Sequence, residues 1–487
     1  MSKSIFKNIV FKFILNLFNL VVPILIGPYV LRKLGPDLMG TVNFAQTIFG
    51  YFFIFASFGV YQYGLREISR VRHNKELLSK TFTSLFIFTS LTTVITTIAY
   101  LFFINYMYSG QVVYTACIIL SFNLIANVFY VEWINEALEN YDFITIKTII
   151  VRIIYIVLLF IFVRSSKDIN NYLYLLVLST VLNNVISYIY IKKRIKFNFK
   201  DIKIFKHIKP MFLVVILSNV NVLYTQLDKF LLGEFVGFKE VGYYTTAQNI
   251  STIISTLLLS VIHATIPRLS HYIAKENDRE YVGLLDKITK VYFMLLFPAS
   301  IGMVVLARQI ILIYGGAEYL EAIPMLVVFS IYMITLGYET ILGNQVMYVK
   351  KKEKEQVEMI FVGGFVNLIL NIILLKTNLL NGTLSIITTM IANILVIFLE
   401  FLYIRKKLNL KFNIFSMDKN KYLIFSLIFI PITMVINSLV NNMFLMTILS
   451  IGINGLAYFG ILFLIKDKTF LELLNKFLFK FKIKHNI

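Results

Sequence analysis

Runs of about 20 consecutive apolar residues recur along most of this chain of 487 residues. A run of that length crosses the ~30 Å hydrocarbon core of a bilayer as one helix. The composition agrees, because 58% of the residues are hydrophobic and 15% are charged, whereas about a quarter of the residues in a soluble domain are charged. The sequence therefore predicts an all-α, polytopic membrane protein.

We predict about fourteen transmembrane helices. The first apolar stretch is too long for the core of a signal peptide, and no small-residue cleavage site follows it, so we expect it to be the first span. The predicted spans are 10–34, 41–65, 81–105, 112–134, 143–164, 171–191, 210–233, 241–266, 288–313, 322–349, 357–376, 382–404, 422–440 and 443–465.

The charges predict how these helices cross the membrane. The formal net charge is +21, and lysine and arginine accumulate in cytoplasmic loops of membrane proteins. With the N-terminus in the cytoplasm, the inner segments hold 37 of the 47 lysines and arginines and the outer segments hold 7. This bias predicts an even number of spans, cytoplasmic N- and C-termini and a location in the plasma membrane. It also explains the positive charge without nucleic acid as a partner.

A short motif occurs twice, 202 residues apart. Residues 35–48 read GPDLMGTVNFAQTI and residues 237–250 read GFKEVGYYTTAQNI, with a glycine, a second glycine, Ala-Gln and Ile at matching places. Each copy lies between two long apolar segments, and six predicted spans separate the copies. The repeat predicts two bundles of equal orientation, related by a pseudo-twofold axis along the membrane normal, as in many transporters.

The basic segment KKRIKFNFKDIKIFKHIK lies at 192–209, where a linker between two six-helix halves is expected. The predicted domains follow from the repeat, this linker and the two spans left over. They are an N-terminal bundle (1–195), a basic cytoplasmic linker (196–209), a C-terminal bundle (210–408), and two extra helices with a basic tail (409–487).

The chain lacks the sequence signatures of soluble enzymes. It has no G-x-x-x-x-G-K-[ST] motif for nucleotide phosphates, and its five histidines are scattered, so no metal site is expected. Its single cysteine, Cys117, cannot form a disulfide within the chain. We therefore expect no catalytic residue, no cofactor and no enzymatic activity.

Charged and polar residues inside the apolar spans are the candidates for function, because each is costly in a bilayer and needs a partner, water or a role. We expect Arg152 and Lys229 to contact an anion. Because Asp228 and Lys229 are adjacent, at least one needs a partner on another helix. Interhelical ion pairs that only fix packing are the alternative role for these charges. Residues expected to line a polar cavity are Asn16, Asn19, Asn219, Asn221, Tyr224 and Gln226.

The segment FYVEWINEALENYDF, near an inner boundary, is acidic against the positive-inside trend. We expect its carboxylates to pair with the basic loop at 66–80. We expect its tryptophan, Trp133, to anchor at the membrane interface.

Several segments together resemble one family. They are IGPYVLRKLGPDLMG (26–40), EWINEALENYDF (132–143), LDKFLLGEFVGFKEVGYYTTAQN (227–249), PRLS (267–270), IYGGAEYLEA (313–322) and GGFVNLILNIILL (363–375). In this order, with fourteen spans, the chain resembles the Wzx-type polysaccharide-biosynthesis flippases. That family belongs to the multidrug/oligosaccharidyl-lipid/polysaccharide (MOP) exporter superfamily.

The resemblance implies a V-shaped pair of six-helix bundles around a central cavity. Its substrate would be an oligosaccharide repeat unit on polyprenyl pyrophosphate, flipped from the cytoplasmic to the outer leaflet by alternating access for a capsule- or O-antigen-like polymer. Membrane lipid and the polysaccharide polymerase machinery would be its other partners. A wet, polar, partly cationic cavity would lower the cost of moving hydrated groups across the bilayer. Asp228 and Glu339 would then be candidates for coupling to H⁺ or Na⁺.

Three alternatives remain open. An ion-coupled multidrug-type exporter shares the fold, but the spans of the first bundle lack acidic residues. A lipid II flippase is expected to carry arginines within its first two helices, and here no charge lies between Lys12 and Arg32 or between Asp37 and Arg66. A membrane polymerase or ligase would need a substantial external loop, which the predicted topology lacks.

Overall fold

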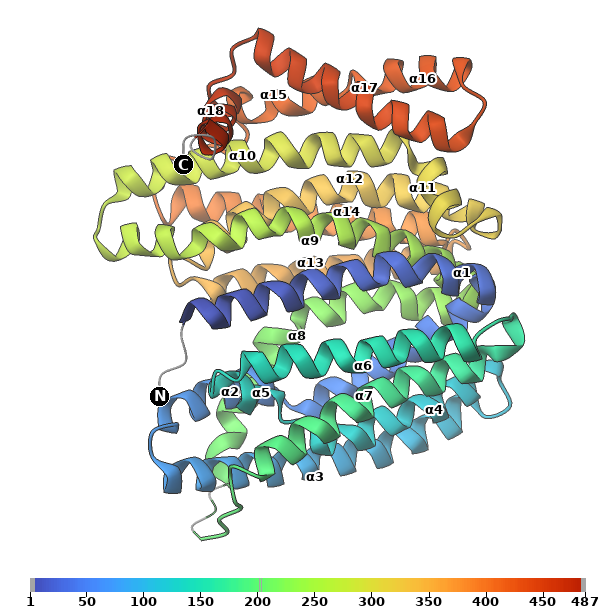
Figure 1. Ribbon diagram of the computed structural model, residues 1–487, viewed down its shortest axis with the longest axis vertical. Coiled ribbons are helices and arrows are strands. Elements are labelled where there is room, and N and C mark those ends of the chain that lie inside the picture. Colours follow the sequence, from blue (N-terminus) through green and yellow to red (C-terminus); the bar gives the residue numbers. More distant parts are fainter. Residues whose placement is uncertain (1–4, 201, 203, 483–487) are drawn as a thin grey trace. The chain divides into compact units, whose positions relative to one another are not determined.

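The computed structural model describes the backbone of residues 5–200, 202 and 204–482. Within these, it describes the side chains outside 5–9, 213, 216–225, 477 and 479–482. Helices account for nearly all of the described chain (Figure 1), and its elements separate into two compact units, Met1–Thr245 and Thr246–Ile487. We predicted two bundles from the repeated motif in the sequence, and that division of the chain stays a prediction.

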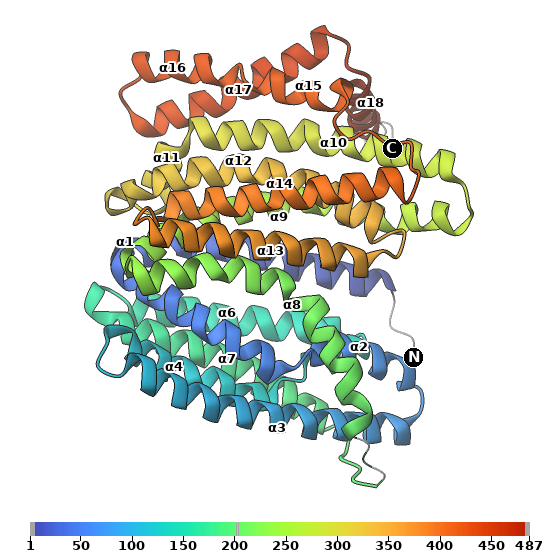
Figure 2. The ribbon, with the colours of Figure 1, turned by 180° about the vertical axis from the view of Figure 1, so that it is seen from behind.

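The first unit is built from eight α-helices, the opening of a ninth and two short 3₁₀ turns. Figure 2 shows α3, α4, α6 and α7 lying side by side with their long axes nearly aligned. The elements are α1 (Ile5–Ser57), α2 (Val60–Val71), α3 (Lys75–Tyr108), α4 (Val112–Ala126), η1 (Asn127–Phe129), α5 (Glu132–Ala137), α6 (Tyr141–Phe162), η2 (Ser166–Asp168), α7 (Ile169–Lys192), α8 (Ile204–Phe235) and the start of α9 (Phe238–Ala274).

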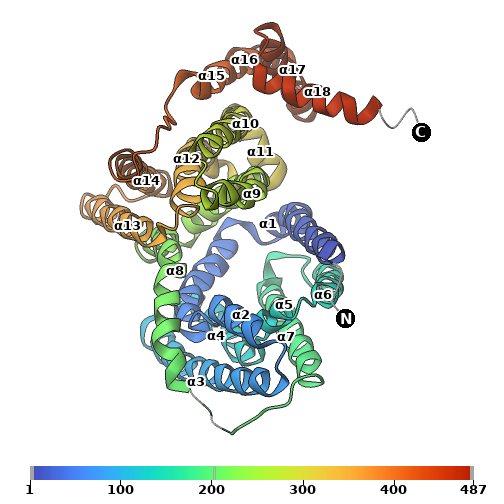
Figure 3. The ribbon, with the colours of Figure 1, turned by 90° about the vertical axis from the view of Figure 1, so that its left-hand side faces the viewer.

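The second unit continues α9 and adds nine further α-helices, one 3₁₀ turn and one π-helix. Figure 3 shows α15–α18 on one side of α10, away from α13 and α14. The elements are α10 (Asp278–Val305), α11 (Ala307–Tyr314), η3 (Ala317–Ala322), α12 (Ile323–Thr340), the π-helix η4 (Ile341–Met347), α13 (Glu353–Lys376), α14 (Gly382–Lys406), α15 (Met417–Ser426), α16 (Phe429–Leu439), α17 (Met443–Leu464) and α18 (Lys468–Lys482).

Twelve helices of the described residues are long and apolar enough to cross a membrane. The first of these, Val10–Val71, has 62 residues, whereas one crossing needs about 20. The chain is therefore an all-helical, multi-pass membrane protein, as predicted. The finer count of fourteen spans stays a prediction.

Helix α1 differs from the predicted pair of spans joined by a loop. Only Gly35 departs from helical geometry, with φ 76° and ψ 170°, a left-handed φ that glycine adopts without strain. Pro36 then starts a new helical segment, because its fixed φ suits a first turn. A second break lies at Phe58 and Gly59, which both have positive φ. Thr92 donates to the carbonyl of Ala56 at this break, at 2.9 Å.

The two copies of the repeated motif meet inside the first unit. An ideal Cβ at Gly40 would lie 1.6 Å from the carbonyl oxygen of Phe238, and one at Gly242 would lie 2.0 Å from that of Pro36. The offset of 202 residues that relates 40 to 242 also relates 36 to 238, so the two contacts are reciprocal. Both glycines are required because no side chain fits between the two backbones.

We predicted that Trp133 anchors at the membrane interface, but its side chain is buried inside the protein. It is buried, with 1% of its surface exposed, and its ring lies against the backbone of α2, where a Cβ at Gly64 would approach it to 2.4 Å. The short helix α5 packs against α2, and the large ring fills the space left by the glycine. The aromatic side chain therefore belongs to the core of this unit.

Candidate functional site

Helices α1 and α6 cross the first unit in parallel. Thr145 donates a hydrogen bond to the carbonyl of Phe11 at 3.1 Å, and Tyr29 donates one to the carbonyl of Val163 at 2.6 Å. Each contact joins residues 134 positions apart, so the register is the same at both ends. Between these two contacts, each residue of α6 therefore lies level with the residue of α1 that comes 134 positions earlier in the sequence.

This register places Arg152 of α6 level with residue 18 of α1. Asn19 is then about 1.5 Å further along the helix axis and Asn16 about 3 Å before it. Arg152 is half-buried, and within the described part of the chain it makes no hydrogen bond or ion pair. The Oδ1 atom of Asn19 is buried without a hydrogen-bond partner among the described residues, while Asn16 is exposed. Three predicted site residues therefore share one level of two packed helices.

The adjacent charges Asp228 and Lys229 lie on α8. Asp228 has no exposed surface and accepts a hydrogen bond from the hydroxyl of Tyr244 on α9 at 2.9 Å. This confirms that one member of the pair finds a partner on another helix. Lys229 is half-buried and forms no ion pair among the described residues.

Gln226 lies on the same helix, and its Oε1 atom accepts a hydrogen bond from Thr47 of α1 at 3.3 Å. This contact satisfies one oxygen of a predicted cavity residue and joins α8 to α1. The side chains of the other three candidates on α8, Asn219, Asn221 and Tyr224, lie outside the described residues.

One buried charge that we gave no role in the sequence forms a network of its own. Lys147 is 7% exposed, and its Nζ lies 3.0 Å from both carboxylate oxygens of Glu132 and 2.8 Å from the hydroxyl of Ser187. Ser187 in turn donates to Glu132 at 2.7 Å. The network joins α5, α6 and α7 and neutralises Lys147, so Arg152 is the cation of α6 left without a partner in the described chain.

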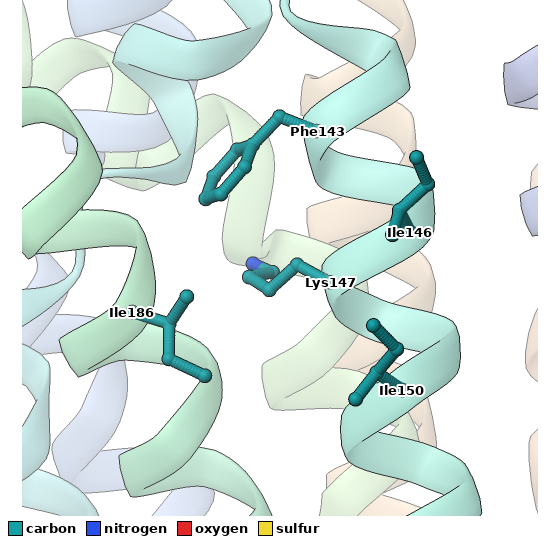
Figure 4. Close-up of a pocket in the computed structure, with 5 residues that line it drawn as sticks. All are labelled: Phe143, Ile146, Lys147, Ile150 and Ile186. Atoms are coloured by element: carbon teal, nitrogen blue, oxygen red, sulfur yellow. The ribbon is translucent and has the colours of Figure 1, made fainter.

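A small cavity of about 280 Å³ lies beside this network. Figure 4 shows Lys147 between Ile186 of α7 and the α6 side chains of Phe143, Ile146 and Ile150. The lining is apolar apart from the lysine, whose charge Glu132 already balances. The cavity therefore offers little to a polar ligand.

The acidic segment meets the basic loop in part, as predicted. Arg72 donates to Glu139 at 2.6 Å, whereas Glu136 accepts from Tyr61 at 2.9 Å and Glu132 pairs with Lys147. These contacts distribute the carboxylates over three separate partners.

In the second unit, Glu339 lies near the end of α12, partly exposed. Its charge acts on Glu400 of α14, a residue to which we assigned no role in the sequence, and Glu400 has no exposed surface. The described residues contain no group of three or more His, Cys, Asp or Glu able to hold a metal ion. Among the described site residues, Arg152 and Lys229 in the first unit and Glu339 and Glu400 in the second form no ion pair.

Comparison with known proteins matches residues 5–273 to the family model described as "Polysaccharide biosynthesis protein". A protein of Escherichia coli (strain K12) designated an O-antigen transporter is 22% identical, over 75% of this chain and 89% of its own length. One of the same designation from Shigella dysenteriae is 25% identical, over 74% and 91%. A protein of Haloferax volcanii designated a low-salt glycan biosynthesis flippase is 23% identical over 33% of this chain and 34% of its own.

Solved structures share the fold. The lipid II flippase MurJ, in an inward closed conformation, superposes with a TM-score of 0.73, covering 97% of this chain and all of its own, at 17% identity. An inward-facing multidrug resistance MATE family transporter of the MOP superfamily gives 0.62, covering 81% of this chain and 94% of its own, at 17% identity. At these identities the likeness concerns the fold alone.

Proposed function

This chain belongs to the polysaccharide biosynthesis protein family, and on that premise we propose that it flips oligosaccharide repeat units linked to polyprenyl pyrophosphate from the cytoplasmic to the outer leaflet. It is a transporter with the MOP fold and not an enzyme. Relatives designated O-antigen transporters and a glycan flippase support a substrate of this broad class. The polymer made from the units would be a capsule- or O-antigen-like surface polysaccharide.

The observation that carries the proposal is the unpaired guanidinium of Arg152 in the middle of a membrane-spanning helix. A charge at that depth is costly unless water or a ligand meets it. A guanidinium binds phosphate oxygens in a two-pronged geometry, and a pyrophosphate is the anionic part of the proposed substrate. Arg152 would contact this group, with Lys229 as a second cation.

The amide side chains at the same level suit the sugar part. Asn19 has a buried oxygen that no described residue satisfies, and Asn16 is exposed. Asparagine both donates and accepts hydrogen bonds, as sugar hydroxyls do. Gln226, Asn219, Asn221 and Tyr224 of α8 would complete the polar lining.

The remaining features describe how the transporter would work. Of the fourteen predicted spans, twelve would form two pseudo-twofold bundles of six that alternate access to a central cavity, and the last two would be extra C-terminal helices. Both termini would lie in the cytoplasm. The reciprocal contact of Gly40 and Gly242 supports such a relation between the halves. Asp228 and Glu339 would couple transport to H⁺ or Na⁺, and the polymerase machinery would receive the flipped unit.

Complementation of a bacterial strain that lacks its own oligosaccharide flippase tests this proposal. Expression of the chain should restore surface polymer and clear lipid-linked single repeats from the cytoplasmic leaflet. A second test strain would hold outward-facing repeats that remain unpolymerised. If the chain rescues that strain, its function is polymerisation instead. Rescue of drug hypersensitivity, or of a lipid II flippase deficiency, without restored polymer would support those alternatives and contradict the proposal.

A further inference from the structure

Two carboxylates of the second unit, Glu339 and Glu400, lie on helices that pack together, and neither forms an ion pair with a described cation. Glu400 of α14 has no exposed surface, and the polar side chain that approaches its carboxylate is the neutral amide of Gln356 on α13. Helix α12 packs against α14, and the charge of Glu339, at the end of α12, acts on Glu400. An ionised carboxylate that is buried without a positively charged partner is among the costliest groups in a protein.

The backbone beside Glu400 is a π-helix that contains a glycine, Gly343. The π-helix η4 follows α12 directly, and wide turns of this type often occur at functional sites. At Gly343 in this helix, an ideal Cβ would lie 3.5 Å from Oε1 of Glu400 and 2.2 Å from the amide nitrogen of Gln356 on α13. The missing side chain therefore opens the space in which Glu400 and Gln356 approach the η4 backbone.

Two further titratable groups on the neighbouring helices, Glu355 and Tyr292, carry no positive charge. On α13, Glu355 pairs with Lys352 at 3.4 Å and accepts a hydrogen bond from Tyr403 of α14 at 3.1 Å. On α10, the phenol of Tyr292 lies within the electrostatic reach of Glu339, and it carries no positive charge. No described lysine or arginine forms an ion pair with Glu339 or Glu400.

From this arrangement we propose that Glu339 and Glu400 share a single exchangeable proton, whose binding and release energise transport. Two interacting carboxylates in a dry site cannot both be ionised, so one proton bound from water relieves their repulsion. Glu339 is partly exposed and would exchange the proton, while the buried Glu400 would hold it inside the unit. The inference rests on the proposed transport function and names its energy source.

A proton suits this site better than a sodium ion. Hard cations take about six oxygen ligands, and the group that meets Glu400 from α13 is the side-chain amide of Gln356, which acts as a hydrogen-bond donor. An N–H donor cannot ligate a cation, but it can donate to a carboxylate that shares a proton. We therefore expect proton exchange to be independent of sodium.

Infrared difference spectroscopy of the full chain in lipid nanodiscs tests the shared proton directly. A pH step should produce a carbonyl band of a buried carboxylic acid, in sodium-free and sodium-containing buffer alike. Glu400→Gln and Glu339→Gln should each remove or shift this band, and the exposed Glu358→Gln on α13 should leave it unchanged. A band that persists in both Glu400→Gln and Glu339→Gln, or one that changes only with sodium, would overturn the inference.

Polymer export by the same variants separates this inference from the proposed function. Suppose that wild type and Glu358→Gln restore export, and that Glu400→Gln does not although it reaches the membrane in equal amounts. Then both the transport function and the shared proton as its energy source are supported. If wild type and Glu400→Gln export equally, the shared proton is not the energy source, although the transport function stands. If wild type itself restores no export, the transport function fails whatever the infrared band shows.

Discussion

Gly40 and Gly242 lie against each other in a reciprocal contact. A Cβ added to Gly40 would come 3.0 Å from the amide nitrogen of Gly242, and a Cβ added to Gly242 would come 3.2 Å from that of Gly40. The two glycines occupy the same place in the repeated motif, so the duplication has a direct structural use. It lets the two copies pack backbone to backbone.

Replacing either glycine should therefore destabilise the protein. In Gly40→Ala the new methyl group would overlap the carbonyl of Phe238, and forcing extra carbon into a packed site costs about 1–3 kcal/mol. Gly242→Ala should behave alike, with a lower thermal unfolding temperature for both purified variants. The control is Gly50→Ala in the same helix, where nothing lies within 4 Å of the added Cβ. Equal unfolding temperatures for Gly40→Ala and Gly50→Ala would contradict the packing described.

The buried pair of Lys147 and Glu132 should contribute to stability as a unit. Removing one partner leaves an uncompensated buried charge, which costs about 3–5 kcal/mol. Lys147→Met and Glu132→Gln should each lower the unfolding temperature, and the double variant should be less destabilised than the sum of the two. The exposed pair Lys354–Glu358, with its atoms 3.9 Å apart, is the matched control and should contribute less than about 1 kcal/mol. Simple additivity at Lys147 and Glu132 would show that the pair does not act as a unit.

Arg152 and Lys229 should be needed for export and not for folding. Charge-assisted hydrogen bonds are worth about 1.5–3 kcal/mol, so Arg152→Ala and Lys229→Ala should each lower export by roughly ten- to a hundredfold. Their amounts in the membrane should stay at the wild-type level, as shown by immunoblotting of membrane fractions. Arg164→Ala, at an exposed position beyond the end of α6, is the matched control. Unchanged export in both test variants would remove the anion site.

Acid should weaken the attachment of α18 through Asp467, which lies between α17 and α18. Burial raises the pKa of Asp467, but the hydrogen bonds from Lys421 and from the amide of Phe470 lower it by more than burial raises it. The pKa of Asp467 therefore lies below its ordinary value. A carboxyl group with a lowered pKa stabilises the fold above the unfolded value of about 4, and this contribution is lost as the pH falls through the folded pKa.

Wild type should therefore lose stability below about pH 4, and Asp467→Asn should be less stable than wild type at pH 7 and converge with it in acid. Thermal unfolding as a function of pH measures both curves. Asp278→Asn, at an exposed position, should follow wild type. A constant difference between Asp467→Asn and wild type at all pH values would show that the charge of Asp467 is not responsible.

The all-helical class and the repeated motif could both be predicted from the sequence, because each follows from a local pattern of residues. Apolar length predicts a span wherever it occurs, and adjacency alone indicated that at least one of Asp228 and Lys229 needs a partner on another helix. The partners themselves depend on how helices rotate and pack, which no local pattern records. Lys147 finds Glu132 across a helix break, and Glu400 lies five positions before Arg405 in a stretch that reads as the end of a span.

Local breaks were equally hard to place. The predicted loop after the first span is a single left-handed residue, Gly35, because Pro36 restarts the helix at once. The predicted interfacial Trp133 is buried because Gly64, almost 70 residues earlier, leaves space for its ring. Such relations link residues far apart in the sequence, so only the packed structure reveals them.

Reconstitution with the proposed substrate tests the central claim most directly. The purified chain would be placed in lipid vesicles that contain a polyprenyl-pyrophosphate-linked oligosaccharide in both leaflets, and an enzyme that cannot cross the membrane would cleave the sugar outside. Wild-type vesicles should lose nearly all of the oligosaccharide, and protein-free vesicles should keep the half in the inner leaflet. Arg152→Ala vesicles should lose that inner half roughly ten- to a hundredfold more slowly than wild type. If wild-type vesicles retain that inner half, the chain does not flip this substrate.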